Sequence, residues 1–257
     1  MVILRSAIYA TQPTPLKSQL ETLLRESTQY PVEDDVLSII VPDSNLLSGG
    51  PVAANVFKAI AGKRYDTVVM VSSSHTGPFK RMTICNLKSY RTPLGEIPLN
   101  EKVCHELCDE DDDIYIDNTG HFHNKGIDVQ LPFLQTVLGN FDIVPIVMGE
   151  ETPEFCKELG AAIGEMMLNR KTLVVASVDI LRSTETDLQT FQTLFEANNT
   201  RSLFPMLNRG ELSLQGKGPL LVAMLASFHR RGKRFQTISL QPPEHDTPGY
   251  FGAYISK

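Results

Sequence analysis

Runs of apolar residues of strand length alternate with segments of helical periodicity along almost the whole chain. The strongest runs are rich in Val and Ile and show little polar alternation, as in IIVP, TVVMV and TLVVA. Strands of this kind are covered on both faces, which is typical of the central strands of α/β proteins. The alternation therefore predicts an α/β fold with a central mixed, largely parallel sheet flanked by helices.

The same patterns place the individual elements. Strands are predicted at 37–42, 67–74, 82–87, 141–149, 172–179, 235–240 and 250–255. Helices are predicted at 14–28, 50–62, 100–109, 127–138, 153–169, 187–197 and 217–231. Since no repeat, low-complexity stretch or long linker divides the chain, we expect a single domain over residues 1–257.

The composition disfavours several classes of function. The chain has 257 residues, of which 42% are apolar and 21% charged, as in an ordinary globular protein with a large core. A formal net charge of −6 argues against nucleic acid or an anionic membrane as partner. No apolar stretch reaches the roughly 20 residues that span a bilayer, and the first residues lack a cleavable signal. We therefore expect a cytoplasmic protein; its oligomeric state is left open.

The cysteines indicate a reducing compartment. Cys85, Cys104, Cys108 and Cys156 form neither a C-x-x-C pair nor the spacing of a disulfide framework. In VCHELC, Cys104 and Cys108 share one helix face, whereas His105 points about 100° away from that face. An amphipathic helix that carries cysteines is expected there rather than a zinc site.

Polar side chains stand at the ends of three predicted strands. Asp43 follows the first, Ser74 and His75 end the second, and Asp179 and Arg182 end the strand over 172–179. Because open α/β sheets bind ligands outside the carboxyl ends of their strands, these side chains predict a shared pocket. Each also has a structural alternative. Asp43 could cap the following helix, and Asp179 and Arg182 could form a local ion pair.

The segment DNTGHFHNKGIDVQ adds His121 and His123. Two histidines two residues apart on an extended segment point the same way and can share a metal ion. They can equally be surface residues without a function. The sequence leaves both interpretations open.

Several motifs, taken in order along the chain, resemble those of the Memo family, which occurs in bacteria and archaea as component B of the AmmeMemoRadiSam system. The stretch IIVPDSNLLSGGPVAANVFKAI resembles the strand, V-P-H-A-G-Y segment and helix of that family. SSSHTGPFK with the downstream TPLGE resembles G-P-S-H and T-P-L-G-E, and KGIDVQLPFLQ resembles E-H-S-L-E-V-Q-L-P-F-L. VVASVDILRS resembles S-S-D-L-S-H, and TPGYFGAYI resembles the closing strand. The resemblance covers nearly the whole chain and implies a fold related to the class III extradiol ring-cleaving dioxygenases.

The resemblance also implies a metal site, and this chain departs from it. The family site is made of the histidine of V-P-H, the first histidine after G-P-S and the cysteine of a C-G pair. His75 matches the second, while Asp43 and Gln215 stand at the other two positions. Three nitrogen or sulfur ligands suit iron, copper or zinc, whereas one imidazole, one carboxylate and an amide form a different donor set.

Two further pocket positions differ. The histidine of E-H-S falls on Lys125, and its glutamate is replaced by Asp128. The aspartate of S-S-D-L-S-H is kept as Asp179, while its histidine has become Arg182. Both changes from histidine add a fixed positive charge to the pocket.

The favoured hypothesis is therefore a divergent member of the family with a degraded metal site and no cofactor. It would bind a small anion or a peptide at the strand ends, because Arg and Lys pair well with carboxylate and phosphate groups. The residues expected to bind this ligand are Ser74, Lys125, Asp128, Arg182 and Gln215.

The alternative hypothesis is a metal-dependent oxidoreductase or dioxygenase-like enzyme with a rebuilt site. One iron, copper or zinc ion would be held by His75, Asp43 and either His121 or His123, as two imidazoles and a carboxylate. In such an enzyme Asp179 and His75 would be the catalytic residues, acting as acid or base.

Overall fold

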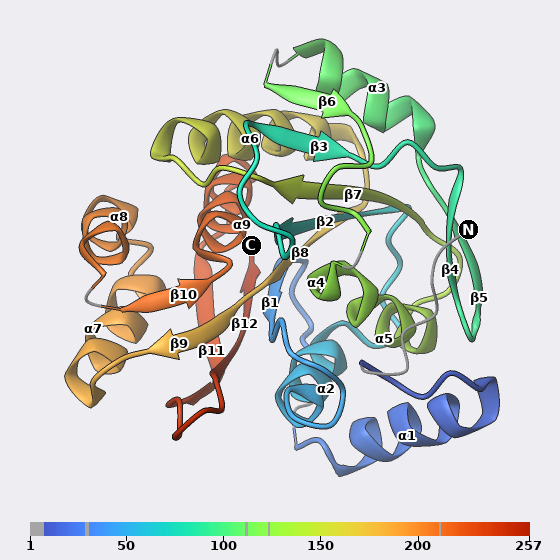
Figure 1. The fold of residues 1–257 in the computed structure, drawn as a ribbon, viewed down its shortest axis with the longest axis horizontal. Helices are drawn as coiled ribbons and strands as arrows, with labels where there is room; N and C mark the ends of the chain where they lie inside the picture. Colours follow the sequence, from blue (N-terminus) through green and yellow to red (C-terminus); the bar gives the residue numbers. More distant parts are fainter. Residues whose placement is uncertain (1–7, 29–30, 111–112, 123, 211) are drawn as a thin grey trace.

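A ten-stranded mixed sheet crosses the molecule, with helices packed on both of its faces (Figure 1). The computed structural model describes residues 8–28, 31–110, 113–122, 124–210 and 212–257. The strands of this sheet are β1 (Val36–Val41), β2 (Thr67–Ser73), β3 (Met82–Ile84), β6 (Ile114–Ile116), β7 (Asp142–Met148), β8 (Thr172–Ser177), β9 (Asp179–Arg182), β10 (Ser213–Gln215), β11 (Arg234–Gln241) and β12 (Gly249–Ser256). Their order is β10-β9-β12-β1-β8-β2-β7-β3-β6, with β11 paired to β12. A separate hairpin is formed by β4 (Ser89–Thr92) and β5 (Gly95–Pro98).

The centre of the sheet is parallel and its outer parts are mostly antiparallel. Strands β1, β8, β2 and β7 pair in parallel in that order. Their Val- and Ile-rich sequences fit this position, because every residue of β1, β2 and β8 is buried. Antiparallel pairing joins β12 to β1, β9 to β12, and β3 to β7. The carboxyl ends of β1, β8 and β2 therefore meet at one edge of the parallel centre.

Two sets of helices cover the two faces. On one face lie α1 (Pro13–Glu26), α2 (Gly50–Ile60), α4 (Lys125–Asp128) and α5 (Gln130–Val137). On the other lie α3 (Glu101–Glu110), α6 (Pro153–Met166) with the 3-10 turn η1 (Met167–Asn169), α7 (Glu185–Glu196), α8 (Thr200–Arg209) and α9 (Lys217–His229). Each face has its own apolar core. In the first, Phe57 of α2 stacks on Phe133 of α5 with ring centroids 4.7 Å apart.

The structure confirms the α/β class and the central mixed sheet, and it corrects some element boundaries. The strand expected over 172–179 is two strands, because β8 ends at Ser177 and β9 begins at Asp179 after a single intervening residue. The helix expected over 127–138 is two helices that meet at Val129.

Several elements were not predicted at all. They are the short strands β4, β5, β6 and β10, and the helix α8. Strands of three or four residues carry too few positions for an alternating pattern to emerge. Helix α8 contains Pro205 in its interior, a residue that disfavours the prediction of a helix.

The cysteine-bearing segment is an amphipathic helix, as expected. In α3, Cys104 is buried and Cys108 is half-buried against the same core, and all four cysteines of the chain are free. Within the described ranges, no helix is long and apolar enough to cross a membrane.

Candidate functional site

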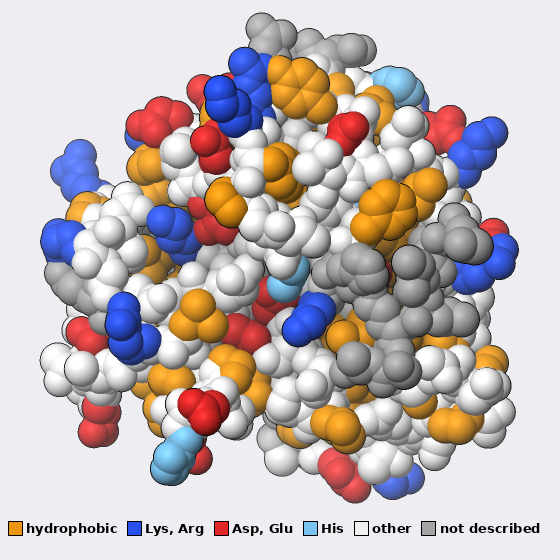
Figure 2. Space-filling view, in the orientation of Figure 1, with side chains coloured by type: hydrophobic (Ala, Val, Ile, Leu, Met, Phe, Trp, Pro, Cys, Tyr) orange, Lys and Arg blue, Asp and Glu red, His pale blue; other side chains and the backbone are white. Residues whose placement is uncertain are grey.

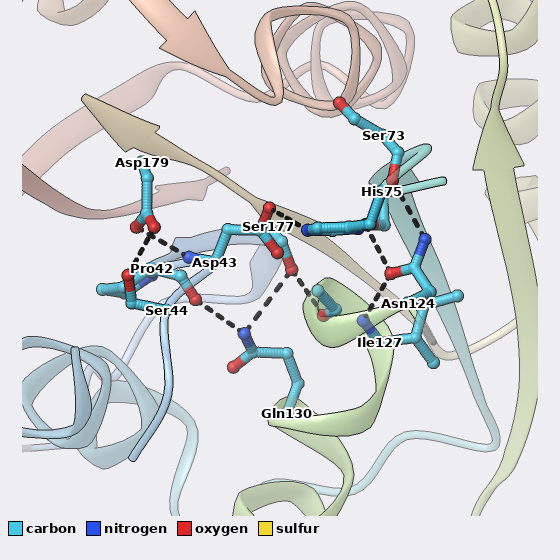
Figure 3. A network of polar contacts seen from close by, with 12 residues as sticks. Pro42, Asp43, Ser44, Ser73, His75, Asn124, Ile127, Gln130, Ser177 and Asp179 are labelled. Carbon is cyan, nitrogen blue, oxygen red and sulfur yellow. Dashed lines mark hydrogen bonds and ion pairs between the residues drawn. The ribbon is translucent and has the colours of Figure 1, made fainter. Parts of the chain in front are cut away.

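Three polar side chains meet where the central parallel strands end. Asp43 stands two residues after β1, His75 two residues after β2, and Asp179 follows β8 at the start of β9. Figure 3 shows their side chains converging from three different strands. The structure therefore brings together Asp43, His75 and Asp179, three of the side chains that the sequence places at this edge.

Asp43 and His75 are bonded directly to each other. The Nε2 atom of His75 lies 2.8 Å from Oδ2 of Asp43. The Asp43 side chain is 2% exposed and that of His75 is 16% exposed, so the contact is largely shielded from water. The second carboxylate oxygen, Oδ1 of Asp43, is buried and has no hydrogen-bond partner among the described residues.

Burial and mutual contact set the protonation of this pair. Burial is the largest influence on Asp43 and raises its pKa, while the hydrogen bond to His75 acts in the opposite direction. For His75, burial lowers the pKa, but the hydrogen bond and the charge of Asp43 outweigh it, and the net pKa is raised. The pair therefore keeps a proton to higher pH than an isolated histidine would.

Asp179 supports the loop that carries Asp43. Its Oδ1 accepts a hydrogen bond from the backbone N–H of Asp43 at 2.9 Å, and its Oδ2 accepts one from Ser44 Oγ at 2.5 Å. Burial is the main cause that raises the pKa of Asp179 to about 6, the nearby Asp43 carboxylate adds to it, and the Ser44 hydrogen bond opposes it. Asp179 is therefore a carboxyl that titrates just below neutral pH.

Asn124 ties the start of α4 to the end of β2. Its side-chain oxygen accepts hydrogen bonds from Ser72 Oγ at 2.9 Å and from the backbone N–H of Ile127 at 3.1 Å. Its side-chain amide donates to the carbonyl of Ser73 at 2.9 Å. Asn124 thus caps α4 and bonds it to a neighbouring strand with one fully buried side chain.

Gln130 and Ser177 tie the same segment to β1 and β8 (Figure 3). Gln130 Nε2 donates to the carbonyl of Pro42 at 2.8 Å, and Ser177 Oγ donates to the carbonyl of Gly126 at 2.6 Å. The approach is so close that a Cβ atom on Gly126 would lie 2.2 Å from Ser72 Oγ and 2.5 Å from Asp43 Oδ1. Only glycine fits at this position without a shift of its neighbours.

These bonds fix the place of Lys125, the first residue of α4. Lys125 is exposed, and its positive charge lowers the pKa of both Asp43 and His75. A fixed cation therefore stands beside the buried pair. Figure 2 shows basic, acidic and histidine surface side by side near the centre of this face.

Gln215 and Arg182 lie further along the same edge. In the antiparallel pairing of β10 with β9, Gln215 is opposite Asp179 and Ser213 is opposite Arg182. Cross-strand partners share a face of the sheet, so Gln215 lies on the face of Asp179, and the register shift brings Arg182 to that face as well. Among the described residues Asp179 and Arg182 form no ion pair, because Asp179 is bonded to the Asp43 loop instead.

The remaining candidates are placed differently. Ser74 Oγ donates to the carbonyl of Gly77 within its own turn, at 2.6 Å. Asp128 is buried in α4. His121 is buried, with Nδ1 3.0 Å from the hydroxyl of Tyr90 and Nε2 3.2 Å from the carbonyl of Thr83, and burial lowers its pKa to about 4. The structure thus brings His121 to Tyr90 and Thr83 rather than to His75, while His123 lies outside the described residues.

Asn124 and Gln130 are not among the residues predicted from the sequence to have a functional role, although both hold the site together. Each had a signal. Asn124 precedes a short helical segment, which is a preferred place for a capping residue. Gln130 is the one polar side chain in the run VQLPFL, and a polar residue buried among apolar ones needs a hydrogen-bond partner.

The described residues do not fit a tightly held iron, copper or zinc ion at this edge. His75 Nε2 and Asp43 Oδ2 satisfy each other, Gln215 is a neutral amide, and Lys125 places a positive charge beside them. Within the described ranges, no group of three or more His, Cys, Asp or Glu side chains has the arrangement of a metal site. The chemistry of this donor set favours a proton between His75 and Asp43.

Comparisons with known proteins agree on one family. The profile of the family described as Memo-like protein matches residues 5–248. A MEMO1 family protein of Thermotoga neapolitana is 32% identical over 209 residues, which cover 77% of this chain and 75% of the relative. A MEMO1 family protein of Saccharolobus solfataricus is 28% identical over 242 residues, covering 85% and 84% of the two chains. In fold, the crystal structure of an uncharacterized protein of Escherichia coli K12 superposes with a TM-score of 0.57 at 13% identity, over 86% of this chain and all of the other.

Proposed function

Because the chain belongs to the Memo-like protein family, we propose that it is a member whose strand-end pocket binds a small anionic ligand in place of a metal ion. The observation that carries the proposal is the contact of 2.8 Å between His75 Nε2 and Asp43 Oδ2 beside the cation of Lys125. Family membership agrees with the motifs of the sequence, and the ligand class follows from the charges of the pocket.

An exposed cation beside the Asp43–His75 pair supports an anion as the ligand. The pair itself is close to neutral when Asp43 is ionised and His75 is protonated, and the Asp179 carboxylate is turned to the Asp43 loop, where it accepts two hydrogen bonds. Lys125 remains as an exposed ammonium group next to the pair, with Arg182 further along the same sheet edge. A carboxylate or phosphate group can accept charge-assisted hydrogen bonds from Lys125, and such bonds are about twice as strong as neutral ones.

The imidazole of His75 offers a second contact. The His75 side chain is 16% exposed, while its Nε2 atom is bonded to Asp43. The exposed edge of the protonated ring would border a ligand bound at Lys125. Lys125 and His75 would thus recognise an anion together, and Asp179 would hold the Asp43 loop in position.

The test is a titration of the protein with inorganic phosphate and with citrate, followed through the ring resonances of His75 by NMR. We expect a saturable shift of these resonances with at least one of the two anions. The Lys125→Gln variant should bind about tenfold more weakly, the loss expected when one charge-assisted contact is removed. The matched control is Lys171→Gln, an exposed lysine at the other end of the sheet, which should leave the titration unchanged.

Two results would contradict the proposal. One is the absence of any saturable shift of His75 with either anion. The other is an unchanged titration in a folded Lys125→Gln protein. A parallel measurement of metal content after loading with iron(II), copper and zinc, with and without His75→Ala, separates the proposal from a metal-dependent enzyme. Stoichiometric metal that is lost in His75→Ala would favour the enzyme.

A further inference from the structure

A second cavity lies at the opposite, amino-terminal end of the parallel strands. It has a volume of about 610 Å³ and is walled by the first residues of β1 and β8, Val36 and Thr172. The chain segments that follow α2, η1 and α9 complete it. A volume of this size is within the usual range of small-molecule sites. It shares no residue with the strand-end pocket around Asp43 and His75.

The lining of this cavity is strongly cationic. Six of its thirteen lining residues are Lys or Arg, whereas the whole chain has only 24 among 257 residues and a net charge of −6. Asp35 is the one acidic side chain among those thirteen. The six cations are Lys63, Arg64, Arg170, Lys171, Arg230 and Lys257.

Three of the six cations already have partners. Lys257 Nζ is 3.0 Å from Asp35 Oδ2, and an Arg170 nitrogen is 2.7 Å from a Glu106 oxygen. Lys63 Nζ donates to the backbone carbonyl of Asp34 at 2.9 Å. The two ion pairs are close to neutral, so they contribute little to the charge of the cavity, while Lys63 keeps its charge.

The other three cations, Arg64, Lys171 and Arg230, differ from these in their contacts. The side chains of Arg64 and Lys171 are exposed and form no hydrogen bond or ion pair with any described residue. Arg230 is half-buried, and its Nε donor is buried without a hydrogen-bond partner in the described part of the chain. A buried donor without a partner is costly, about 1–3 kcal/mol, unless a ligand or water satisfies it.

Helix ends explain part of this charge but not all of it. At the amino-terminal end of the strands, α2, α9 and the segment of α6 and η1 present their carboxyl ends, each equivalent to roughly −0.5 charge. These ends would offset between one and two of the four positive charges of Lys63, Arg64, Lys171 and Arg230. A surplus of roughly two to three positive charges therefore remains in the cavity.

We propose that this cavity at the amino-terminal end of the parallel strands is a second ligand site, which binds a small molecule carrying two or more phosphate groups. The surplus charge matches a multiply charged anion, and the guanidinium groups of Arg64 and Arg230 have the planar geometry that binds phosphate oxygens in pairs. Nucleic acid is a poorer match, because the cations line a single hollow on a protein that is acidic overall.

The experiment is a calorimetric titration with inorganic pyrophosphate at low ionic strength. The wild-type protein is compared with the double variant Arg64→Gln/Lys171→Gln, with Lys80→Gln as the matched control, and with Lys125→Gln, which removes a cation from the other end of the sheet. We expect binding by the wild-type protein, affinity at least about tenfold weaker in the double variant, and no change in Lys80→Gln. Both replaced side chains are exposed, so the double variant should fold, which its thermal unfolding verifies.

A wild-type protein that does not bind pyrophosphate would overturn the proposal. A folded double variant that binds as tightly as the wild type would overturn it too. If Lys125→Gln binds pyrophosphate more weakly and the double variant binds it as the wild type does, pyrophosphate binds in the strand-end pocket and the proposal is wrong. Since each site has its own variant, the failure of one proposal leaves the other intact.

Discussion

His75 Nε2 lies 2.8 Å from Asp43 Oδ2, so the residues that follow two central strands are bonded to each other instead of to a third group. The Asp43 side chain is 2% exposed and that of His75 is 16% exposed, so the two side chains form a shielded acid–base pair.

The first prediction concerns the protonation of His75. Replacement of Asp43→Asn removes the charge that raises the pKa of His75 and leaves burial, which lowers it. We expect the pKa of His75 to fall, as measured by NMR titration of its ring resonances. An unchanged or higher pKa in a folded variant would show that the two side chains are not coupled.

The second prediction is a rise in the pKa of His75, measured through the same ring resonances. The charge of Lys125 lowers the pKa of His75, so Lys125→Gln should raise it. The rise should shrink when salt is added, because an exposed charge is screened. Exposed Lys80 serves as the control, and Lys80→Gln should move the pKa of His75 less than Lys125→Gln does.

The third prediction is a pH dependence of stability from Asp179. Its pKa of about 6 in the folded protein lies above the ordinary 3.8, so the folded state favours the protonated carboxyl. This contribution to the free energy of unfolding is complete below pH 3.8 and is lost as the pH rises through about 6.

The Asp179→Asn variant has no carboxyl group at this position, so its stability does not fall as the pH rises through about 6. The stability of the variant relative to the wild type should rise between about pH 4 and 7, by on the order of 1–3 kcal/mol. Urea unfolding at several pH values measures it. A difference between the two proteins that is constant with pH would contradict the assignment.

The fourth prediction tests the close approach at Gly126. A Cβ atom there would lie 2.2 Å from Ser72 Oγ and 2.5 Å from Asp43 Oδ1, so Gly126→Ala should cost about 1–3 kcal/mol of stability through overpacking. Gly139→Ala is the matched control, since a Cβ atom at Gly139 meets nothing within 4 Å. Equal unfolding free energies of the two variants would refute the tight packing of α4 on the strand ends.

The fifth prediction restores the donors of the family motif. Asp43→His with Gln215→Cys would supply two imidazoles and a thiolate at one edge, a donor set that suits zinc or cobalt(II). We expect cobalt(II) to bind the double variant with sulfur-to-metal charge-transfer absorption, and not to bind the wild-type protein. A folded double variant without that absorption would show that position 215 does not face His75.

Much of this architecture can be predicted from the sequence, because the central strands are long and apolar. The meeting of Asp43, His75 and Asp179 follows from the rule that parallel strands end at one edge. The family resemblance is confirmed by the match over residues 5–248. These features depend on patterns that extend over many residues.

The finer features of the site depend on single contacts and could not be predicted from the sequence. Nothing in the sequence pairs His75 with Asp43, since a hydrogen bond depends on positions that only the folded chain defines. The start of β9 at Asp179 was missed because one residue separates it from β8. The bonds of Asn124 and Gln130 to strand carbonyls require the helix pair to dock first.

The hydrogen bonds of Asn124, Gln130 and Ser177 have a thermodynamic consequence for any ligand at Lys125. The backbone beneath the lysine is already ordered in the free protein, so binding loses little backbone entropy, and ordering costs fall mainly on the lysine side chain. The same rigidity limits adaptation. A pocket whose floor is bonded to three strands at once should discriminate among ligands by size and charge more sharply than a pocket that can reshape itself.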